Sequence, residues 1–228
     1  MLRAAVNLGA IAVLAGCSGS LSTLDPAGPA AEAIARLWWV MLAGSLVLFA
    51  LVMFLFAAAF LRPGFSAAVP AHRWVVLGGL ALPAVVLVPL VAYGLSSGEH
   101  LLPLPGATPP RVEVRAEQWG WTFRYPDYGG KTTRVLHLPA GTPVDMVVTS
   151  RDVIHSFWIP RLAGKMDAIP GRVNVLRIQA DAPGRYEGTC SEFCGIGHAG
   201  MRFEVVAHPA GDFPAALARA GDAAEAKK

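Results

Sequence analysis

Three residues that bind soft metals lie close together near the C-terminal end of this sequence. Cys194, His198 and Met201 follow one another at spacings of four and three residues. A thiolate, an imidazole and a thioether from one loop, with a distant histidine, form the ligand set of a blue-copper centre, because soft sulfur ligands favour copper over hard cations. Three glycines in the same stretch allow the loop to fold tightly around a metal. They are Gly195, Gly197 and Gly200.

The candidate for the distant histidine is His155. It lies thirty-five residues before Cys190, between the strand-like residues 147–149 and an apolar run at 157–159. The other histidines lack sulfur neighbours, and a lone histidine is usually an ordinary surface or core residue. We leave these others unassigned: His72, His100, His137 and His208.

Cys190 adds a second thiolate four residues before Cys194. Two bridging cysteines can hold two copper ions close together, and an unpaired electron shared by both metals changes the geometry little when one electron arrives. A disulfide between Cys190 and Cys194 is an alternative in an oxidising compartment, but it explains neither His198 nor Met201. A zinc site is a further alternative, although zinc seldom recruits methionine.

The elements that hold these ligands have the pattern of β-strands. From residue 111 onward apolar side chains alternate with a period of two, over 111–116 and again over 119–125. About seven short strands separated by turn signals predict an antiparallel sandwich or barrel. The further strand-like runs are 134–138, 144–149, 173–180, 185–190 and 202–207. A helical period appears only in the alanine-rich tail from Pro214.

Two tryptophans occur in the second of these runs. Trp119 and Trp121 are two residues apart, so they share one face of an extended strand. The pattern alone places both in the core of the sandwich, and we assign Trp121 to it.

The N-terminus has the layout of an export signal. Residues 1–16 begin with Arg3 and continue as a short apolar run. The four residues 14–17 resemble the cleavage box of a bacterial lipoprotein, which predicts removal of 1–16 and lipidation of Cys17. The alternative is an uncleaved or ordinary signal with an incidental cysteine.

Two uncharged stretches are long enough to cross a membrane. Residues 37–61 and 74–98 each exceed the roughly 30 Å hydrocarbon core at about 1.5 Å per residue. The loop 62–73 carries Arg62 and Arg73, as a cytoplasmic loop should. We therefore predict a transmembrane helical hairpin whose connecting loop is cytoplasmic and whose flanking segments are all exported. These segments are 17–36, the proline-rich linker 99–110, the domain 111–208 and the tail 209–228.

Composition agrees with a membrane protein and argues against nucleic-acid binding. Apolar residues make up 54% of the 228 residues and charged residues only 15%, a balance that points to membrane segments. Residues 101–228 hold fifteen basic and thirteen acidic side chains. Such a near-balance does not provide the concentrated basic surface that nucleic acids require.

At this point the sequence resembles a known family. The stretch 190–201, with 152–156 and 167–172, resembles subunit II of the heme–copper cytochrome c oxidases, and the similarity extends over roughly residues 30–208. The resemblance implies that 111–208 is a cupredoxin-like Greek-key barrel with a dinuclear copper centre, CuA. It also implies how the two copper ions are held. The ligands would be Cys190 and Cys194 bridging both ions, His155 and Met201 on one, and His198 with the backbone carbonyl of Glu192 on the other.

The same resemblance implies roles for residues around the copper. The Glu192 carboxylate would bind magnesium or manganese where the chain meets the catalytic subunit I, and Asp167 and Arg172 would lie at that contact. Trp119 would be exposed above the copper and receive electrons from cytochrome c. Acidic residues that could meet a basic cytochrome are Asp127, Asp145 and Asp152.

The function implied is that of the electron-accepting subunit of a proton-translocating respiratory oxidase in the bacterial inner membrane. Its partners would be cytochrome c, subunit I, other oxidase subunits and the lipid bilayer. Many such subunits carry a glutamate near the cytoplasmic start of the second span, but 74–98 contains no acidic residue. This chain is therefore not expected to supply that proton-uptake group.

Three other functions remain as alternatives. The quinol oxidase counterpart shares the fold but lacks the copper ligands. A membrane-anchored copper-storage or copper-delivery protein would need no aromatic residue such as Trp119 beside the metal. Nitrous oxide reductase has a similar copper motif, but its propeller domain does not fit into 228 residues.

Overall fold

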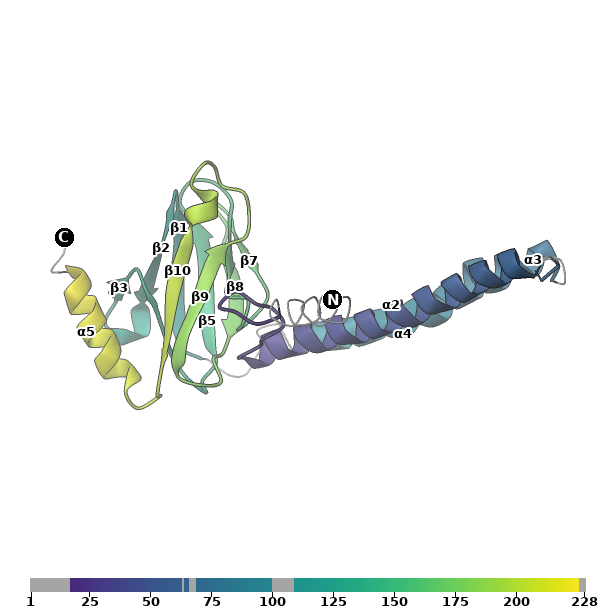
Figure 1. The fold of residues 1–228 in the computed structure, drawn as a ribbon. Coiled ribbons are helices and arrows are strands. Elements are labelled where there is room, and N and C mark those ends of the chain that lie inside the picture. Colours follow the sequence, from purple (N-terminus) through teal and green to yellow (C-terminus); the bar gives the residue numbers. More distant parts are fainter. Residues whose placement is uncertain (1–16, 63, 66–68, 100–108, 226–228) are drawn as a thin grey trace, which may run out of the picture. The chain divides into compact units, whose positions relative to one another are not determined.

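A computed structural model of the chain describes residues 17–62, 64–65, 69–99 and 109–225. It divides into two compact units (Figure 1). One unit is Arg36–His100. The other unit combines the part of the chain before Arg36 with the part after His100. The predicted signal 1–16 and most of the linker 99–110 lie outside the described residues.

Two helical segments in the described residues are long and apolar enough to cross a membrane. Helix α2 (Pro29–Leu61) begins at a proline, which suits the first turn because its missing N–H has no partner there anyway. The second segment runs through α3 (Ala71–Arg73), η1 (Trp74–Ala81) and α4 (Leu82–Glu99). The wide π turns of η1 end two residues before Pro83, whose ring would clash with the carbonyl four residues earlier in a regular α-helix. The predicted spans 37–61 and 74–98 fall inside these helices.

The β domain consists of two five-stranded sheets. The first has the order β3-β2-β1-β5-β8, with strands β3 (Lys131–Thr133), β2 (Gly120–Tyr125), β1 (Arg111–Glu117), β5 (Val144–Ser150) and β8 (Asn174–Ile178). The second has the order β4-β10-β9-β6-β7, with strands β4 (Leu136–Pro139), β10 (Arg202–His208), β9 (Gly184–Cys190), β6 (His155–Trp158) and β7 (Met166–Ala168). Two short 3₁₀ turns, η2 (Pro126–Tyr128) and η3 (His198–Gly200), complete the domain.

The core lies between the two sheets and contains several packed aromatic rings. Phe123 points inward from the first sheet, while Phe157 and Phe203 come from the second and stack with centroids 5.1 Å apart. Trp121 is buried beside both of these rings, as predicted. Burying one such side chain contributes roughly 1.5–3 kcal/mol, so this cluster is a main source of the stability of the domain.

The prediction of a helical hairpin followed by an all-β sandwich is confirmed, but the prediction of purely antiparallel strands is wrong. Strand β1 pairs with β5 in parallel, and β10 pairs with β4 in parallel. Between the two strands of each parallel pair, the chain crosses to the other sheet. It then returns to the first sheet running in the same direction as before, as a crossover connection allows. Three strands were also missed, because β3 and β7 have only three residues and consecutive residues of β6 are buried.

Residues 17–28 form a strap that packs on the β domain. The Ala27 N–H donates to the Arg161 carbonyl at 2.7 Å, and the Ala27 carbonyl accepts from the Asp181 N–H at 3.0 Å. The Arg161 guanidinium also pairs with Asp25 at 3.1 Å, and the Ser20 hydroxyl donates to Glu187. The predicted exported segment 17–36 is therefore in large part an integral piece of the β domain.

Helix α5 (Phe213–Glu225) covers the side of the domain where β3 and β4 form the edges of their sheets (Figure 1). Its buried face contributes Phe213 and Leu217, and the Phe213 ring meets Tyr128 edge-on at 5.1 Å. Lys131 pairs with Asp222 at the far end of the helix. Covering two edge strands with a helix prevents them from pairing with another chain.

Two histidines lie between this helix and the sheet. His137 Nδ1 and His208 Nε2 are 2.9 Å apart, and the rings are stacked. Burial, together with the nearby His208, lowers the pKa of His137 to about 4, against the opposing effect of Glu204. Burial and Arg219 lower the pKa of His208 as well, although Asp212 opposes them. The pair is therefore neutral at physiological pH.

We expect this pair to make the domain sensitive to acid. Between about pH 6.5 and pH 4 the unfolded chain protonates His137 while the folded chain does not, so the unfolded state binds more protons and the unfolding free energy falls as pH falls. The shift corresponds to a loss of about 3 kcal/mol at most. Denaturant unfolding of the full chain in detergent should show a flatter pH dependence over this range for His137→Gln than for the wild type. Equal slopes for both proteins would contradict the prediction.

Candidate metal site

The candidate ligands come from the ends of three strands and the loop between two of them. His155 is the first residue of β6, Cys190 is the last residue of β9, and Met201 directly precedes β10. The Cys190 N–H donates to the Met201 carbonyl at 2.9 Å, which closes the loop 191–200 at its base. The core strands therefore fix both ends of the ligand loop.

Two buried sulfur atoms form the centre of the site. Cys190 Sγ and Cys194 Sγ are 3.8 Å apart, far beyond the roughly 2.05 Å of a disulfide bond, and both cysteines are free. The ligand atoms of His155, Cys190 and Cys194 all lie within 4.8 Å of one another. The disulfide alternative therefore does not describe this structure.

The remaining predicted donors surround the same two sulfurs. His155 Nδ1 is 3.9 Å and the Glu192 carbonyl oxygen 3.3 Å from Cys190 Sγ. His198 Nδ1 is 3.6 Å and Met201 Sδ 3.8 Å from Cys194 Sγ. Two thiols, two imidazoles, a thioether and a carbonyl thus converge on one buried place. This sulfur-rich donor set fits copper better than a hard cation.

Asp152 holds His155 in the orientation that a metal needs. His155 Nε2 is hydrogen-bonded to Asp152 Oδ1 at 2.9 Å, which leaves Nδ1 facing Cys190. Burial alone would raise the pKa of Asp152, but hydrogen bonds from His155, Gln118 and Val153 lower it to about 2. Such a carboxylate behind a histidine fixes the ring and raises its basicity as a ligand.

The thiols are held in a setting that disfavours free negative charge. Burial and the neighbouring Cys190 raise the pKa of the Cys194 thiol to about 11. A cation bound between the sulfurs reverses this balance, because metal coordination deprotonates a thiol.

Trp119 lies directly over the ligand loop. The Trp119 Nε1–H donates to the Cys194 carbonyl at 3.1 Å, and the Gln118 side chain donates to the same oxygen at 2.8 Å. A Cβ atom at Gly197 would overlap the indole ring, and Gly195 has a left-handed φ of 113°. Only glycine therefore allows the loop to pass beneath the ring at these positions.

The exposure of Trp119 distinguishes it from Trp121. Trp119 is 43% exposed, whereas Trp121 is buried. The assumption that both share one strand face is wrong, because β2 begins at Gly120 and Trp119 belongs to the preceding turn. The hydrogen bond to Cys194, rather than the strand, sets the position of the ring.

Charged residues beside the ligand loop form a small network. Lys165 Nζ lies 3.2 Å from Asp167 and 3.7 Å from Glu192. The Glu192 side chain therefore points away from the sulfurs toward Lys165, while its backbone carbonyl faces Cys190. Arg172 is exposed on the loop after β7, and its N–H donates to the Ile169 carbonyl.

The acidic residues considered as docking groups are all engaged within the domain, and of the three Asp152 adjoins a ligand. Asp145 is buried and pairs with Arg177 at 2.7 Å. Asp127 accepts from the Arg111 N–H at the start of β1. Asp152 is engaged by His155. The sequence missed the supporting roles of Gln118 and Asp152, although the i,i+3 spacing of Asp152 and His155 was a usable signal.

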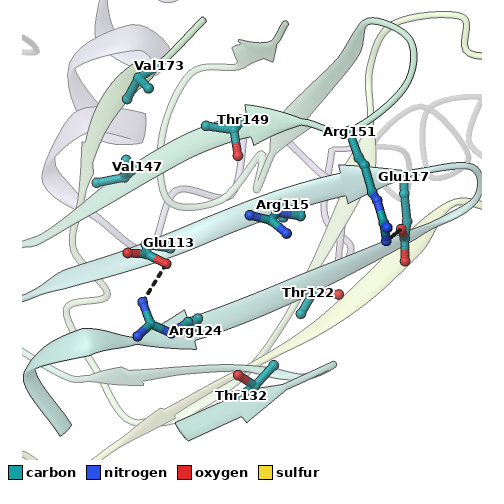
Figure 2. Close-up of a pocket in the computed structure, with 10 residues that line it drawn as sticks. All are labelled: Glu113, Arg115, Glu117, Thr122, Arg124, Thr132, Val147, Thr149, Arg151 and Val173. Atoms are coloured by element: carbon teal, nitrogen blue, oxygen red, sulfur yellow. Dashed lines mark hydrogen bonds and ion pairs between the residues drawn. The ribbon is translucent and has the colours of Figure 1, made fainter. Parts of the chain in front are cut away.

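A separate hollow of about 530 Å³ lies on the outer face of the first sheet (Figure 2). It contains two ion pairs, Glu113 with Arg124 at 2.9 Å and Glu117 with Arg151 at 3.2 Å. None of the predicted ligands lines it. Its mixture of paired charges and threonines is typical of a solvated sheet face.

Comparison with known proteins connects this site to characterised relatives. A family model described as the periplasmic domain of cytochrome c oxidase subunit II matches residues 131–208. Cytochrome c oxidase subunit 2 of Alkalihalophilus pseudofirmus is 32% identical over 209 residues, covering 85% of this chain and 61% of that protein. Quinol oxidase subunit 2 of Bacillus cereus is 30% identical over 220 residues, covering 90% of this chain and 75% of that protein.

One solved structure is similar to about half of this chain. The crystal structure of the periplasmic domain of subunit II of cytochrome oxidase (CoxB) of Bradyrhizobium japonicum is 27% identical, with a TM-score of 0.50. It covers 53% of this chain and 99% of that one. The chain spans 61% and 33% of the length of two curated relatives, the second being cytochrome c oxidase subunit 2 of Synechocystis. Two apolar helices and a periplasmic domain fit a membrane protein with an extracytoplasmic C-terminal domain.

Proposed function

Because this chain belongs to the cytochrome c oxidase subunit II family, we propose that it is the electron-accepting subunit of a respiratory cytochrome c oxidase. It receives single electrons from cytochrome c near Trp119 and delivers them to the heme of subunit I, where oxygen is reduced to water. The oxygen chemistry belongs to subunit I within a proton-translocating oxidoreductase. This chain provides the docking surface and the route by which electrons reach it.

The observation that carries the proposal is the convergence of four further donors on two free, buried sulfurs. In this proposal Cys190 and Cys194 would both help to hold two copper ions. His155 and Met201 would complete one ion, and His198 with the Glu192 carbonyl would complete the other. When bound, the copper pair supplies a one-electron couple with a shared charge, which keeps rearrangement small.

The protein around the donors favours electron transfer over copper delivery. His155, Cys190, Cys194 and Met201 are buried, and hydrogen bonds hold the base of their loop and the back of His155. A delivery protein exposes its ligands for exchange, whereas a rigid site limits reorganisation. The complete donor set also favours cytochrome c over quinol as the donor, since quinol oxidase counterparts lack these ligands.

The proposal is tested by metal content and spectroscopy of the full chain purified in detergent. The strap formed by 17–28 packs on the β domain, so we keep it in the protein tested. We expect two copper ions per chain and a paramagnetic resonance pattern from one electron shared equally by both nuclei. One copper per chain with the electron on a single nucleus would contradict a dinuclear centre.

Glu192 serves two sites in this proposal. Its backbone carbonyl binds copper, whereas its carboxylate binds magnesium or manganese at the contact with subunit I, with Asp167 and Arg172 nearby. In the isolated chain the carboxylate lies 3.7 Å from Lys165, and hard cations prefer carboxylate oxygen to an amide.

We expect Glu192→Gln to keep both copper ions, because the backbone carbonyl is unchanged, and to weaken the interface metal at least about tenfold. Metal analysis of the assembled oxidase at graded manganese concentrations measures both effects. If the variant loses copper and keeps the interface metal, the two roles are assigned the wrong way round.

The chain is proposed to be held in the bacterial inner membrane by two helices and by lipid on Cys17, with the β domain on the periplasmic side. Diacylglyceryl lipid on Cys17 would add an anchor at about 0.8 kcal/mol per buried methylene, in addition to the two helices. Mass spectrometry of the mature N-terminus decides the point. A lipid-modified Cys17 supports it, and an intact Met1 contradicts it.

A further inference from the structure

Helix α5 is held on the β domain by an apolar face and an ion pair. The buried side chains of this face are Phe213, Ala216 and Leu217, and Lys131 of β3 pairs with Asp222. An isolated helix of 13 residues is marginal in water, so α5 depends on this contact for its own structure. Local opening of such a segment requires far less free energy than unfolding of the two sheets.

The pair formed by His137 and His208 lies beneath this helix. His137 is on β4, His208 ends β10, and the His208 ring is 6.4 Å from the Phe213 ring of α5. His137 Nδ1 and His208 Nε2 are 2.9 Å apart, so one nitrogen donates its hydrogen to the lone pair of the other. This bond requires at least one neutral ring. If both rings are protonated, two N–H groups and two positive charges face each other over the same distance.

The groups packed around His137 do not offset a positive charge on both rings. Burial and the charge of a protonated His208 oppose the protonated form of His137, whereas Glu204 on β10 favours it. This carboxylate is already paired with Arg185 on β9. The Tyr125 hydroxyl on β2 accepts a hydrogen bond from the backbone N–H of His137. Burial raises the pKa of this tyrosine, so it stays neutral.

The groups packed around His208 come from α5 and from the turn before it. Burial opposes the charged form of His208, and Arg219 of α5 opposes it as well. Asp212 has the opposite effect, but neither ring is hydrogen-bonded to a carboxylate in the parts of the chain that the structure describes. The pair of Lys131 and Asp222 is neutral as a whole. Double protonation is therefore unfavourable while α5 is in place.

We propose that the His137–His208 pair is an acid-sensitive switch that releases α5 when both rings are protonated. In the docked state the pair is neutral, whereas in the released state both rings are in water and take up protons at mildly acid pH. Acid therefore favours the released state. Release uncovers the edges of β3 and β4 (Figure 1), whose backbone groups are then available to pair with another strand. The switch involves no copper ligand and is independent of the proposed function.

The first test measures hydrogen exchange of the full chain in detergent, by mass spectrometry, at about pH 7 and about pH 5. Each rate is divided by the intrinsic rate of an unprotected amide at the same pH, which gives the equilibrium constant of local opening. We expect this constant to rise at least about tenfold at the lower pH for residues 131–139 and 213–225, because the pKa of His137 rises from about 4 to its ordinary value on release.

Strand β8 is the internal control for this test, because it forms the opposite edge of the first sheet. Its opening constant should not change between the two pH values. An equal rise in β8 would mean that acid opens the whole domain, and an unchanged constant for residues 131–139 would mean that acid does not release α5. Either result overturns the proposal.

The second test replaces both histidines. The double variant His137→Gln/His208→Gln keeps a polar side chain at each position but does not titrate, so its opening constant should agree at the two pH values within about twofold. His72→Gln is the matched control, because His72 is exposed on α3 in the other unit. It should keep the full pH dependence of the wild type. Wild-type pH dependence in the double variant would assign the release to other groups and overturn the proposal.

A third test locks α5 in place without changing the histidines. A Cβ atom at Gly221 would lie 3.2 Å from the Cβ of Lys131, slightly closer than the roughly 3.5–4.5 Å of a disulfide. Lys131→Cys with Gly221→Cys can therefore form this bond after a small shift. With the disulfide formed, residues 131–139 should stay protected at the lower pH, and reduction should restore the rise. Opening of 131–139 in the oxidised variant would show that exposure of these edges does not require release of α5, which contradicts the switch.

Discussion

Replacing Trp119 with glutamine is expected to slow electron transfer from reduced cytochrome c by roughly 10²-fold or more. The indole is exposed, covers the ligand loop and donates a hydrogen bond to the Cys194 carbonyl, so it connects the surface directly to the backbone of a sulfur ligand. Glutamine removes the aromatic contact, and an exposed tryptophan at the centre of an interface typically carries several kcal/mol of binding. Stopped-flow mixing of the assembled oxidase with reduced cytochrome c measures the effect.

Two controls show whether Trp119 acts on electron transfer or on the fold. Copper content, and oxygen consumption driven by a small reductant that acts beyond the copper, should stay near wild type, because the ligands are fixed by β6, β9 and β10. Trp119→Phe keeps a ring but loses the hydrogen bond to Cys194, so its rate should be intermediate. A normal rate in Trp119→Gln, or loss of copper, would make Trp119 a structural residue only.

Replacing Cys190 with serine is expected to reduce the metal content from two copper ions to one. His155 Nδ1 lies 3.9 Å and the Glu192 carbonyl oxygen 3.3 Å from Cys190 Sγ. Loss of this sulfur therefore removes the donor that lies between these ligands and Cys194. A serine hydroxyl is a hard, neutral ligand and does not replace a bridging thiolate. The remaining copper should show an electron confined to one nucleus by paramagnetic resonance.

The matched control for this experiment is Cys17→Ser. Cys17 is the cysteine that lies outside the site, exposed at the start of the strap, so its replacement should leave both copper ions in place. Two equivalent copper ions in Cys190→Ser would show that Cys190 is not a bridging ligand. Met201→Leu should keep both ions and shift the reduction potential, because a weak axial ligand tunes the metal more than it holds it.

The sequence by itself determined the chemistry of the site. Cys190, Cys194, His198 and Met201 lie within twelve residues, so a single loop brings them together whatever the rest of the fold does. His155 was found because it is the histidine that follows a strand-like run and precedes an apolar one. The two helices were equally clear, since uncharged runs of that length have few alternatives to crossing a membrane.

Tertiary structure alone decided how the strands pair and which charges are free. A period of two specifies which side chains face inward but not the neighbouring strand, so the parallel pairs β1–β5 and β4–β10 were not predictable from alternation. Likewise, Asp145 and Asp152 are acidic residues in the sequence, but contacts with Arg177 and His155 engage both. Long-range contacts of this kind have no local sequence signal.

The position of Trp119 shows the same division most clearly. Alternation in 119–125 placed Trp119 in the core beside Trp121. In the structure a turn ends before β2, and a hydrogen bond to a carbonyl 75 residues away holds the ring at the surface. The local sequence pattern predicts which side chains of a strand are buried. The position of a residue just outside the strand depends instead on the distant loop that packs against it.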